Sequence, residues 1–156
     1  MSGSSTSVGG FMRNSMLVSV LLALPMAAQA AALLLNDLKA QNGVQLSADE
    51  LKQLMPNAKV VSYYVAAGTS TRRWTNETDG KFVASTDGGS DPGIRIGSTA
   101  QGTWHVGDNG TYCVTIDWRR ISENWCRYIF KVGGKYYGVR NVTDGAVVAH
   151  EFEFSK

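Results

Sequence analysis

Residues 111–132 read TYCVTIDWRRISENWCRYIFKV and contain two runs in which apolar and polar side chains alternate. Alternation with a period of two is the pattern of a β-strand that buries one of its faces. We therefore expect strands over residues 111–118 and 125–132, joined as a hairpin by a short turn. Both cysteines of the chain, Cys113 and Cys126, fall in this hairpin.

The pattern of short strand and tight turn continues through residues 57–156, where the turns are Asp-Gly, Asn-Gly and Gly-Gly dipeptides. Further strands are expected over residues 59–65, 71–76, 81–86, 94–98, 103–106, 135–140 and 146–154. Such regular spacing is typical of an antiparallel meander. We expect a mainly all-β fold of eight or nine strands, either a small barrel or a sandwich, and favour the barrel because closure removes exposed strand edges.

Residues 31–56 have a helical character and precede the β-domain. Leucines are frequent up to an Asn42-Gly43 stop, and Ser47 to Glu50 then form a capping box, in which each side chain bonds the other residue's amide. Pro56 ends this segment. We expect one or two short helices here that pack their leucines onto the main core as a lid.

The first 30 residues match an export signal. Arg13 gives a positive start, residues 16–24 (MLVSVLLAL) form an apolar core, and Ala28-Gln29-Ala30 is a cleavage site. The apolar run is too short to span a bilayer. We expect residues 1–30 to be removed and the mature protein to be periplasmic or secreted, without a membrane span.

Charge and length restrict the partners of the mature chain. The 156 residues include 15 Lys+Arg and 13 Asp+Glu, a formal charge of +2 that falls to +1 when residues 1–30 are removed. So small a charge, without a binding motif, argues against a nucleic-acid partner. The two histidines have no metal-binding spacing. We expect a single-domain monomer without cofactor or metal.

Export predicts that Cys113 and Cys126, the only cysteines, form a disulfide. Closing so short a loop would contribute on the order of 3 kcal/mol to stability. A redox or nucleophilic thiol is the alternative, but the chain has no C-x-x-C motif.

The disulfide conflicts with the alternation of the hairpin. Cys113 lies opposite the apolar face of the first strand, which carries Tyr112, Val114, Ile116 and Trp118. The apolar face of the second strand carries Cys126, Tyr128, Phe130 and Val132. Directly opposed cysteines would therefore turn one apolar face outward. We expect either a β-bulge near Asp117 or Asn124, or a bridge beyond the regular ladder; without these, the disulfide is the weaker prediction.

Several arginines stand next to tryptophans, a pairing that suits acidic sugars, phosphorylated lipids or an acidic protein. The candidate ligand-binding residues are Arg72, Arg73, Trp74, Trp104, Trp118, Arg119, Arg120, Trp125 and Arg127. A structural alternative is that the tryptophans fill the barrel while the arginines flank strand ends, since alternation places Arg73 and Trp74 on opposite faces.

Two resemblances add to this pattern. Gly102-Thr103-Trp104 resembles the G-x-W signature of lipocalin and avidin-type barrels, in which the tryptophan packs across the closed end. The motifs LSADEL (46–51), GTWHV (102–106), GTYC (110–113) and WCR (125–127) resemble short exported bacterial proteins grouped as a domain of unknown function. This second resemblance implies a periplasmic, disulfide-bonded β-domain and brings no catalytic residues.

Two classes of function remain. The first is a non-enzymatic binding module that engages a small amphipathic ligand, a glycan or a protein through the barrel mouth or an Arg/Trp face. The second is a small secreted hydrolase or redox protein that uses His105 or His150, an acidic residue such as Asp117 or Glu151, or the thiols.

A glycine-rich loop at residues 88–93 could mimic a binding loop but is expected to be a hairpin loop.

Overall fold

The structure is a computed structural model that describes residues 1, 3–4, 32–64, 70–87 and 94–156. The chain divides into two units, Met1–Ala30 and Ala31–Lys156. The predicted export signal lies almost wholly outside the described residues, as does the glycine-rich loop. No helix among the described residues has both the length and the apolar character that a bilayer crossing requires.

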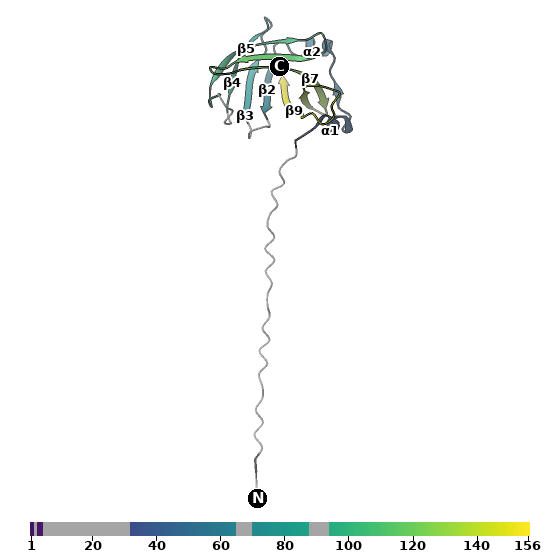
Figure 1. The fold of residues 1–156 in the computed structure, drawn as a ribbon, viewed down its shortest axis with the longest axis vertical. Coiled ribbons are helices and arrows are strands. Elements are labelled where there is room, and N and C mark those ends of the chain that lie inside the picture. Colours follow the sequence, from purple (N-terminus) through teal and green to yellow (C-terminus); the bar gives the residue numbers. More distant parts are fainter. Residues whose placement is uncertain (2, 5–31, 65–69, 88–93) are drawn as a thin grey trace. The chain divides into compact units, whose positions relative to one another are not determined.

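Nine strands of the described residues belong to one sheet, and eight of them close into a barrel (Figure 1). They are β1 (Val44–Gln45), β2 (Lys59–Tyr64), β3 (Ser70–Thr75), β4 (Lys81–Thr86), β5 (Thr99–Val106), β6 (Tyr112–Asp117), β7 (Ser122–Val132), β8 (Lys135–Val139) and β9 (His150–Ser155). Each strand from β2 to β9 pairs antiparallel with the next, and β9 pairs back with β2. The predicted meander and its closure into a barrel are confirmed.

Some predicted strand positions are wrong. Residues 94–98 form a turn, in which the Ser98 amide donates to the carbonyl oxygen of Arg95 and Gly97 has a φ of 71°. The predicted strand at residues 103–106 is the second half of β5. Nothing in the sequence predicts β1, because two residues are too few to show an alternation.

Two short helices precede the barrel strands: α1 (Leu35–Ala40) and α2 (Ala48–Leu54). The predicted capping box is present, since the Glu50 amide donates to Ser47 Oγ at 3.2 Å and the Ser47 amide donates to Glu50 Oε2 at 2.7 Å. The Ser47 amide and, next, the Ser47 hydroxyl at 2.9 Å donate to the Glu50 carboxylate and lower its pKa. Leu51 of α2 belongs to the barrel core, so α2 closes the end of the barrel at which β2 begins.

The two cysteines are bonded and lie directly opposite each other, because Cys113 of β6 pairs with Cys126 of β7. The register is unbroken along the whole of β6, so the bulge or displaced bridge expected from the sequence is wrong. The difference lies in the direction of the β7 side chains, because the apolar face expected inside the barrel is on the outside. The β7 residues Glu123, Trp125 and Arg127 point into the barrel, whereas Tyr128, Phe130 and Val132 point outward with Cys126.

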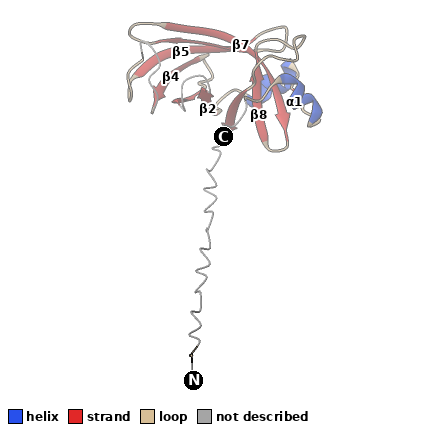
Figure 2. Cartoon of the chain, turned by 60° about the horizontal axis from the view of Figure 1, so that its bottom comes forward, coloured by secondary structure: helices blue, strands red, loops and turns tan. Residues whose placement is uncertain are grey.

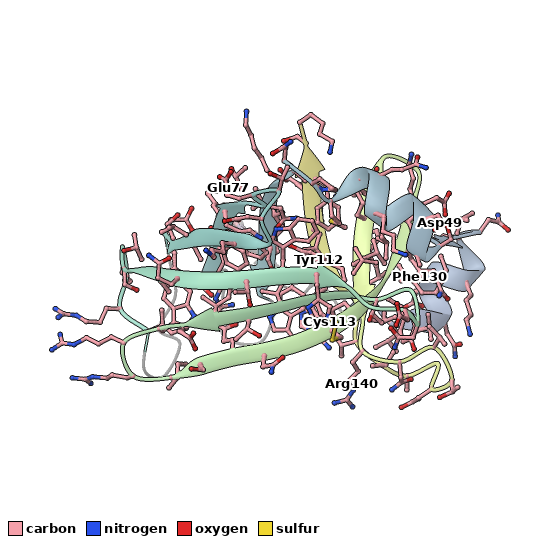
Figure 3. All side chains as sticks on the ribbon, turned by 90° about the horizontal axis from the view of Figure 1, so that it is seen from above. Asp49, Glu77, Tyr112, Cys113, Phe130 and Arg140 are labelled. Carbon is pink, nitrogen blue, oxygen red and sulfur yellow. A yellow bond between two sulfur atoms is a disulfide. The ribbon has the colours of Figure 1, made fainter. Side chains whose placement is uncertain are left out.

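A second hydrophobic core buries this outward apolar face. Leu35 and Leu38 of α1 are fully buried and pack in a cluster with Phe130, Val139 and neighbours in the segment before β9. Figure 2 shows α1 beside β7 and β8, and Figure 3 shows Phe130 among the helices. The N-terminal helices are therefore a lid, as expected, but they cover two different surfaces.

Side chains fill most of the barrel. Trp74 stacks on Phe82 with ring centroids 5.1 Å apart. Near the closed end, the Tyr112 hydroxyl donates to Asn76 Oδ1 at 2.9 Å and accepts from Trp74 Nε1 at 3.1 Å. Burial raises the pKa of Tyr112, so this phenol stays neutral and bonded. The barrel interior is a packed core, with room for ligands only where the packing stops.

The lid makes a prediction about stability. Leu38→Ala should lower the free energy of unfolding by about 2–5 kcal/mol, because it leaves a cavity in the second core. Urea unfolding followed by circular dichroism measures the change, with exposed Gln41→Ala as the matched control in the same segment. Equal stability of L38A and Q41A would contradict the covering role of α1.

Candidate functional site

The end of the barrel opposite α2 carries a hollow between two loops, which we call the mouth hollow. One loop joins β4 to β5 and the other joins β6 to β7. Its volume is about 370 Å³, and it is lined by Arg95, Ile96, Gly97, Ser98, Thr99, Trp118, Arg119 and Arg120. Trp118 is buried at 5% exposure, so its indole belongs both to the core and to the wall of the hollow.

The mouth hollow combines cationic and apolar groups. Arg95, Arg119 and Arg120 are all exposed, and none of the ion pairs between described residues involves them. Ile96 stands beside them with 72% of its surface exposed, and Ile121 follows Arg120 in the same turn at 38%. An exposed isoleucine among unneutralised guanidinium groups suits an anionic ligand that also has an apolar part.

A buried ion pair supports the wall of the mouth hollow. Trp118 Nε1 donates to Glu123 Oε1 at 2.6 Å, and Arg72 Nη2 lies 3.0 Å from the same carboxylate oxygen. The side chains of Arg72 and Glu123 are only 5% and 16% exposed. The Arg72 guanidinium also lies 6.0 Å from the centre of the Trp118 ring. These contacts fix the orientation of the indole from inside the barrel.

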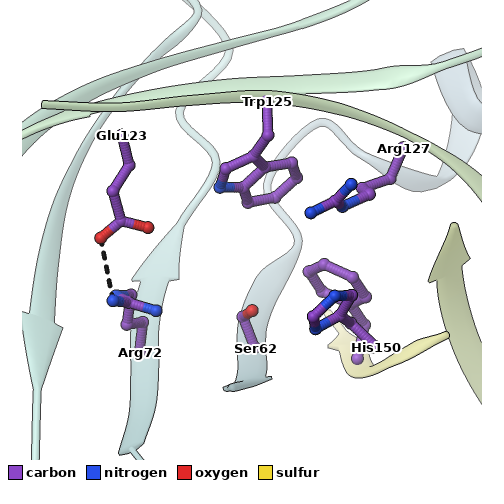
Figure 4. Close-up of a pocket in the computed structure, with 7 residues that line it drawn as sticks. Ser62, Arg72, Glu123, Trp125, Arg127 and His150 are labelled. Atoms are coloured by element: carbon purple, nitrogen blue, oxygen red, sulfur yellow. Dashed lines mark ion pairs between the residues drawn. The ribbon is translucent and has the colours of Figure 1, made fainter. Parts of the chain in front are cut away.

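A smaller hollow, which we call the inner cavity, lies within the barrel (Figure 4). Its volume is about 40 Å³, and it is lined by Ser62, Arg72, Glu123, Trp125, Arg127, His150 and Phe152. The Arg127 guanidinium lies 5.8 Å from the centre of the Trp125 ring. Burial, and next the positive charge of Arg127, lower the pKa of His150.

The structure separates the candidate residues predicted from the sequence. Arg72, Trp74, Trp118, Trp125 and Arg127 face the interior, whereas Arg119 and Arg120 are exposed at the mouth. Arg73 is on the outer face, where it pairs with Asp87 at 3.0 Å. Half-buried Trp104 donates from Nε1 to the Glu77 carbonyl oxygen at 2.8 Å, in the turn between β3 and β4 near the closed end. The candidate residues therefore form no single Arg/Trp face.

Several residues of these hollows were not predicted. Arg95 and Ile96 lie in a turn and not in the predicted strand, and nothing in the sequence indicates Ser62 or Glu123. His105 is exposed, whereas His150 is half-buried and faces inward. The alternation of β9 indicates this inward position, because His150 lies on the same face of the strand as Phe152 and Phe154.

The groups proposed for hydrolase or redox chemistry do not converge. His105 is exposed on the outer face of β5, opposite Cys113 in the register, whereas His150 lines the inner cavity. Both sulfur atoms are joined in the disulfide. Glu151 pairs with Lys135 on the outside, and Asp117 accepts a hydrogen bond from Ser122. Within the described ranges, no cluster of three potential metal ligands occurs.

Comparison with known proteins gives one match. The profile of a family described as "Protein of unknown function (DUF995)" matches residues 18–126, about 70% of the chain. No curated protein and no solved structure matches the chain. The comparison therefore supports the resemblance to a family of unknown function and assigns no activity to either hollow.

The inward histidine predicts a pH dependence of stability. The folded state holds the pKa of His150 below its ordinary value of 6.5, so the unfolded chain binds the proton more readily. Stability is therefore lost as the pH falls from about 7 through the ordinary histidine range toward the lower folded pKa. His150→Gln should reduce this loss between about pH 7 and pH 5, measured by urea unfolding at each pH.

The exposed His105 provides the matched control. His105→Gln removes an imidazole from the outer face and should leave the pH dependence of the wild-type protein unchanged. The inward placement of His150 is contradicted if the two single variants respond to pH alike.

Proposed function

The chain belongs to the DUF995 family, whose function is unknown, and we propose that it is an exported, non-enzymatic, monomeric module that binds a small anionic amphiphile at its barrel mouth. The mouth hollow is the observation that carries this proposal. Its volume of about 370 Å³ falls within the usual range of small-molecule sites. Its lining joins three exposed arginines to an exposed isoleucine and a tryptophan.

The arginines favour an anionic head group. Each guanidinium presents a planar fork of N–H donors that matches two oxygens of a phosphate or a carboxylate. Arg119 and Arg120 are consecutive in one turn, and Arg95 comes from the facing loop, so an anion in the mouth hollow can meet guanidinium groups from two sides. The mature chain has a net charge near zero, so the positive charge at the mouth hollow is a local feature and not a general property of the surface.

The apolar residues favour a short hydrocarbon part on the same ligand. Removing an isoleucine side chain from water contributes about 1.5–3 kcal/mol when burial is complete. Ile96 is the most exposed large apolar residue of the described β-domain, so an apolar group laid against it and Trp118 removes surface that water now covers.

The packing of the barrel supports the mouth rather than the interior as the site. Core side chains fill the barrel, and the inner cavity of about 40 Å³ is too small for an amphiphile. The signal pattern in residues 1–30 and the Cys113–Cys126 disulfide support the export part of the proposal.

Isothermal titration with n-octyl phosphate, below its micelle concentration, tests the mouth site. The wild-type protein should bind one equivalent. The double variant Arg119→Gln/Arg120→Gln should bind at least about tenfold more weakly, because it loses two charge-assisted contacts. Its melting temperature should stay near the wild-type value, since both side chains are exposed.

The control double variant Lys52→Gln/Lys59→Gln removes the same charge from exposed positions on α2 and the start of β2, at the closed end. It should bind n-octyl phosphate as the wild type does. Equal binding of uncharged n-octyl glucoside, or equal weakening by the two double variants, would refute an anion site at the mouth. Binding of inorganic phosphate as tight as that of n-octyl phosphate would refute the apolar half of the proposal.

A further inference from the structure

The first half of β7 has a neighbouring strand on only one of its edges, among the strands that the structure describes. β7 has 11 residues and β8 only five, so β7 continues past the end of β8 (Figure 2). β8 pairs with residues 128–132 of β7, whereas β6 pairs with residues 122–127 on the opposite edge. The line of β8 is therefore vacant, in the described part of the chain, beside the half of β7 that approaches the mouth.

The backbone groups that face this vacant line follow from the hydrogen bonds further along β7. β1 and β6 lie on one edge of β7 and β8 lies on the other, and the Leu46 amide donates to the Ile129 carbonyl oxygen at 2.8 Å on the β1 edge. Successive residues of an antiparallel strand direct their N–H and C=O groups to opposite edges. The groups of Ser122, Asn124 and Cys126 therefore point away from β6, and we call these three residues the open edge.

Two further observations agree with this assignment. The Cα atoms of Cys113 and Cys126 are only 4.0 Å apart, and the closer pairs of an antiparallel ladder are those that exchange no hydrogen bonds. All three residues of the open edge are exposed, and no hydrogen bond between described residues uses their backbone groups. Such a row of backbone donors and acceptors is a template for another strand.

Arginines stand at both ends of the open edge. Arg119 and Arg120 lie in the turn that leads into β7, and Arg140 follows the last residue of β8, where the vacant line begins. All three are exposed, and the ion pairs between described residues do not involve them. A strand that occupies the vacant line therefore meets positive charge at each of its ends.

This charge decides between two kinds of occupant. Two copies of the chain paired antiparallel along their open edges would bring Arg120 of one copy toward Arg140 of the other, at both ends of the contact. Such like charges oppose association. Carboxylates at the ends of an added strand instead form charge-assisted hydrogen bonds with the guanidinium groups.

We propose that the open edge binds an extended acidic segment of another protein as an added β-strand. At about 3.4 Å per residue, about five to seven residues of the partner span the edge and reach the arginines at both ends. This binding is independent of the ligand of the mouth hollow, although Arg119 and Arg120 border both surfaces.

The test is amide hydrogen exchange, measured by NMR, on the intact mature protein with and without a synthetic peptide. The peptide alternates valine and threonine and carries glutamates at both ends. Without it, the Asn124 and Cys126 amides should exchange fast and the Trp125 amide, which faces β6, slowly. The peptide should slow exchange at Asn124 and Cys126 at least about tenfold, in a saturable manner, and leave Trp125 unchanged.

Variants at one position separate the backbone donor from the side chain. Asn124→Pro removes the central N–H of the open edge and should weaken peptide binding at least about tenfold, while the ladder to β6 keeps its hydrogen bonds. Asn124→Thr keeps the N–H and should bind as the wild type does. Arg140→Gln keeps the whole backbone and should weaken binding several-fold even if N124P does not fold. Neither residue lines the mouth hollow, so these variants should bind n-octyl phosphate normally.

Two control peptides separate strand addition from charge alone. Methylation of alternate backbone nitrogens keeps the glutamates but removes the donors of an added strand, so this peptide should not slow exchange at Asn124 and Cys126. A peptide with lysines in place of the glutamates should bind at least about tenfold more weakly, because it meets the arginines with like charge.

Four results would overturn the proposal. Slow exchange at Asn124 and Cys126 without peptide would mean that the open edge is already covered. Protection that grows with protein concentration alone would assign the edge to a second copy. Equal protection by either control peptide would remove the backbone or the acidic part of the proposal. Unchanged binding by R140Q and, where it folds, by N124P would place the peptide elsewhere, with n-octyl phosphate binding at the mouth hollow unaffected.

Discussion

The direct opposition of Cys113 and Cys126 across β6 and β7 determines which side chains enter the barrel. Side chains alternate with a period of two, so one fixed pair sets the facing of both strands. Because Cys113 lies on the outer face of β6, Cys126 must be outside as well. Trp125 and Arg127 then turn inward, and the aromatic residues that follow on β7 turn outward. A register shifted by one residue would turn Trp125 and Arg127 outward and the following aromatic residues of β7 inward.

Both hollows and the role of α1 follow from this register. The outward face of β7 needs a cover, and Leu35 and Leu38 of α1 provide it by forming the second core. The inward face of β7 brings Glu123 to Arg72 and to the Trp118 indole, so one carboxylate connects the inner cavity to the wall of the mouth hollow. Replacing only one member of a buried pair leaves an uncompensated charge, which costs about 3–5 kcal/mol. The two hollows therefore depend on the same ion pair, although their linings differ.

The sequence predicted the repetitive parts of the structure and missed those that depend on contacts between distant segments. Alternation and turn dipeptides were sufficient for the meander, its closure and most strand positions, and the Ser47–Glu50 pattern was sufficient for the start of α2. Alternation along β6 and β7 shows a conflict at the disulfide only if both apolar faces must point into the barrel. The second core removes this conflict, and it forms only when α1 meets Phe130. Likewise, Arg72 and His150 share the parity of buried aromatic neighbours, but the residues that line the inner cavity beside them come from other strands.

Nuclear Overhauser contacts of the aromatic side chains in the intact mature protein test the β6–β7 register most directly. The register predicts contacts from the Trp125 indole to the ring of Phe152, whose centroids are 5.7 Å apart. It also predicts contacts from the Phe130 ring to the methyl groups of Leu38, in the second core. The opposite result is a Phe130 ring in contact with Tyr112 and Phe152, and a Trp125 indole without contacts to either. That result would reverse the facing of β7 and remove the basis of the inner cavity and of the wall of the mouth hollow.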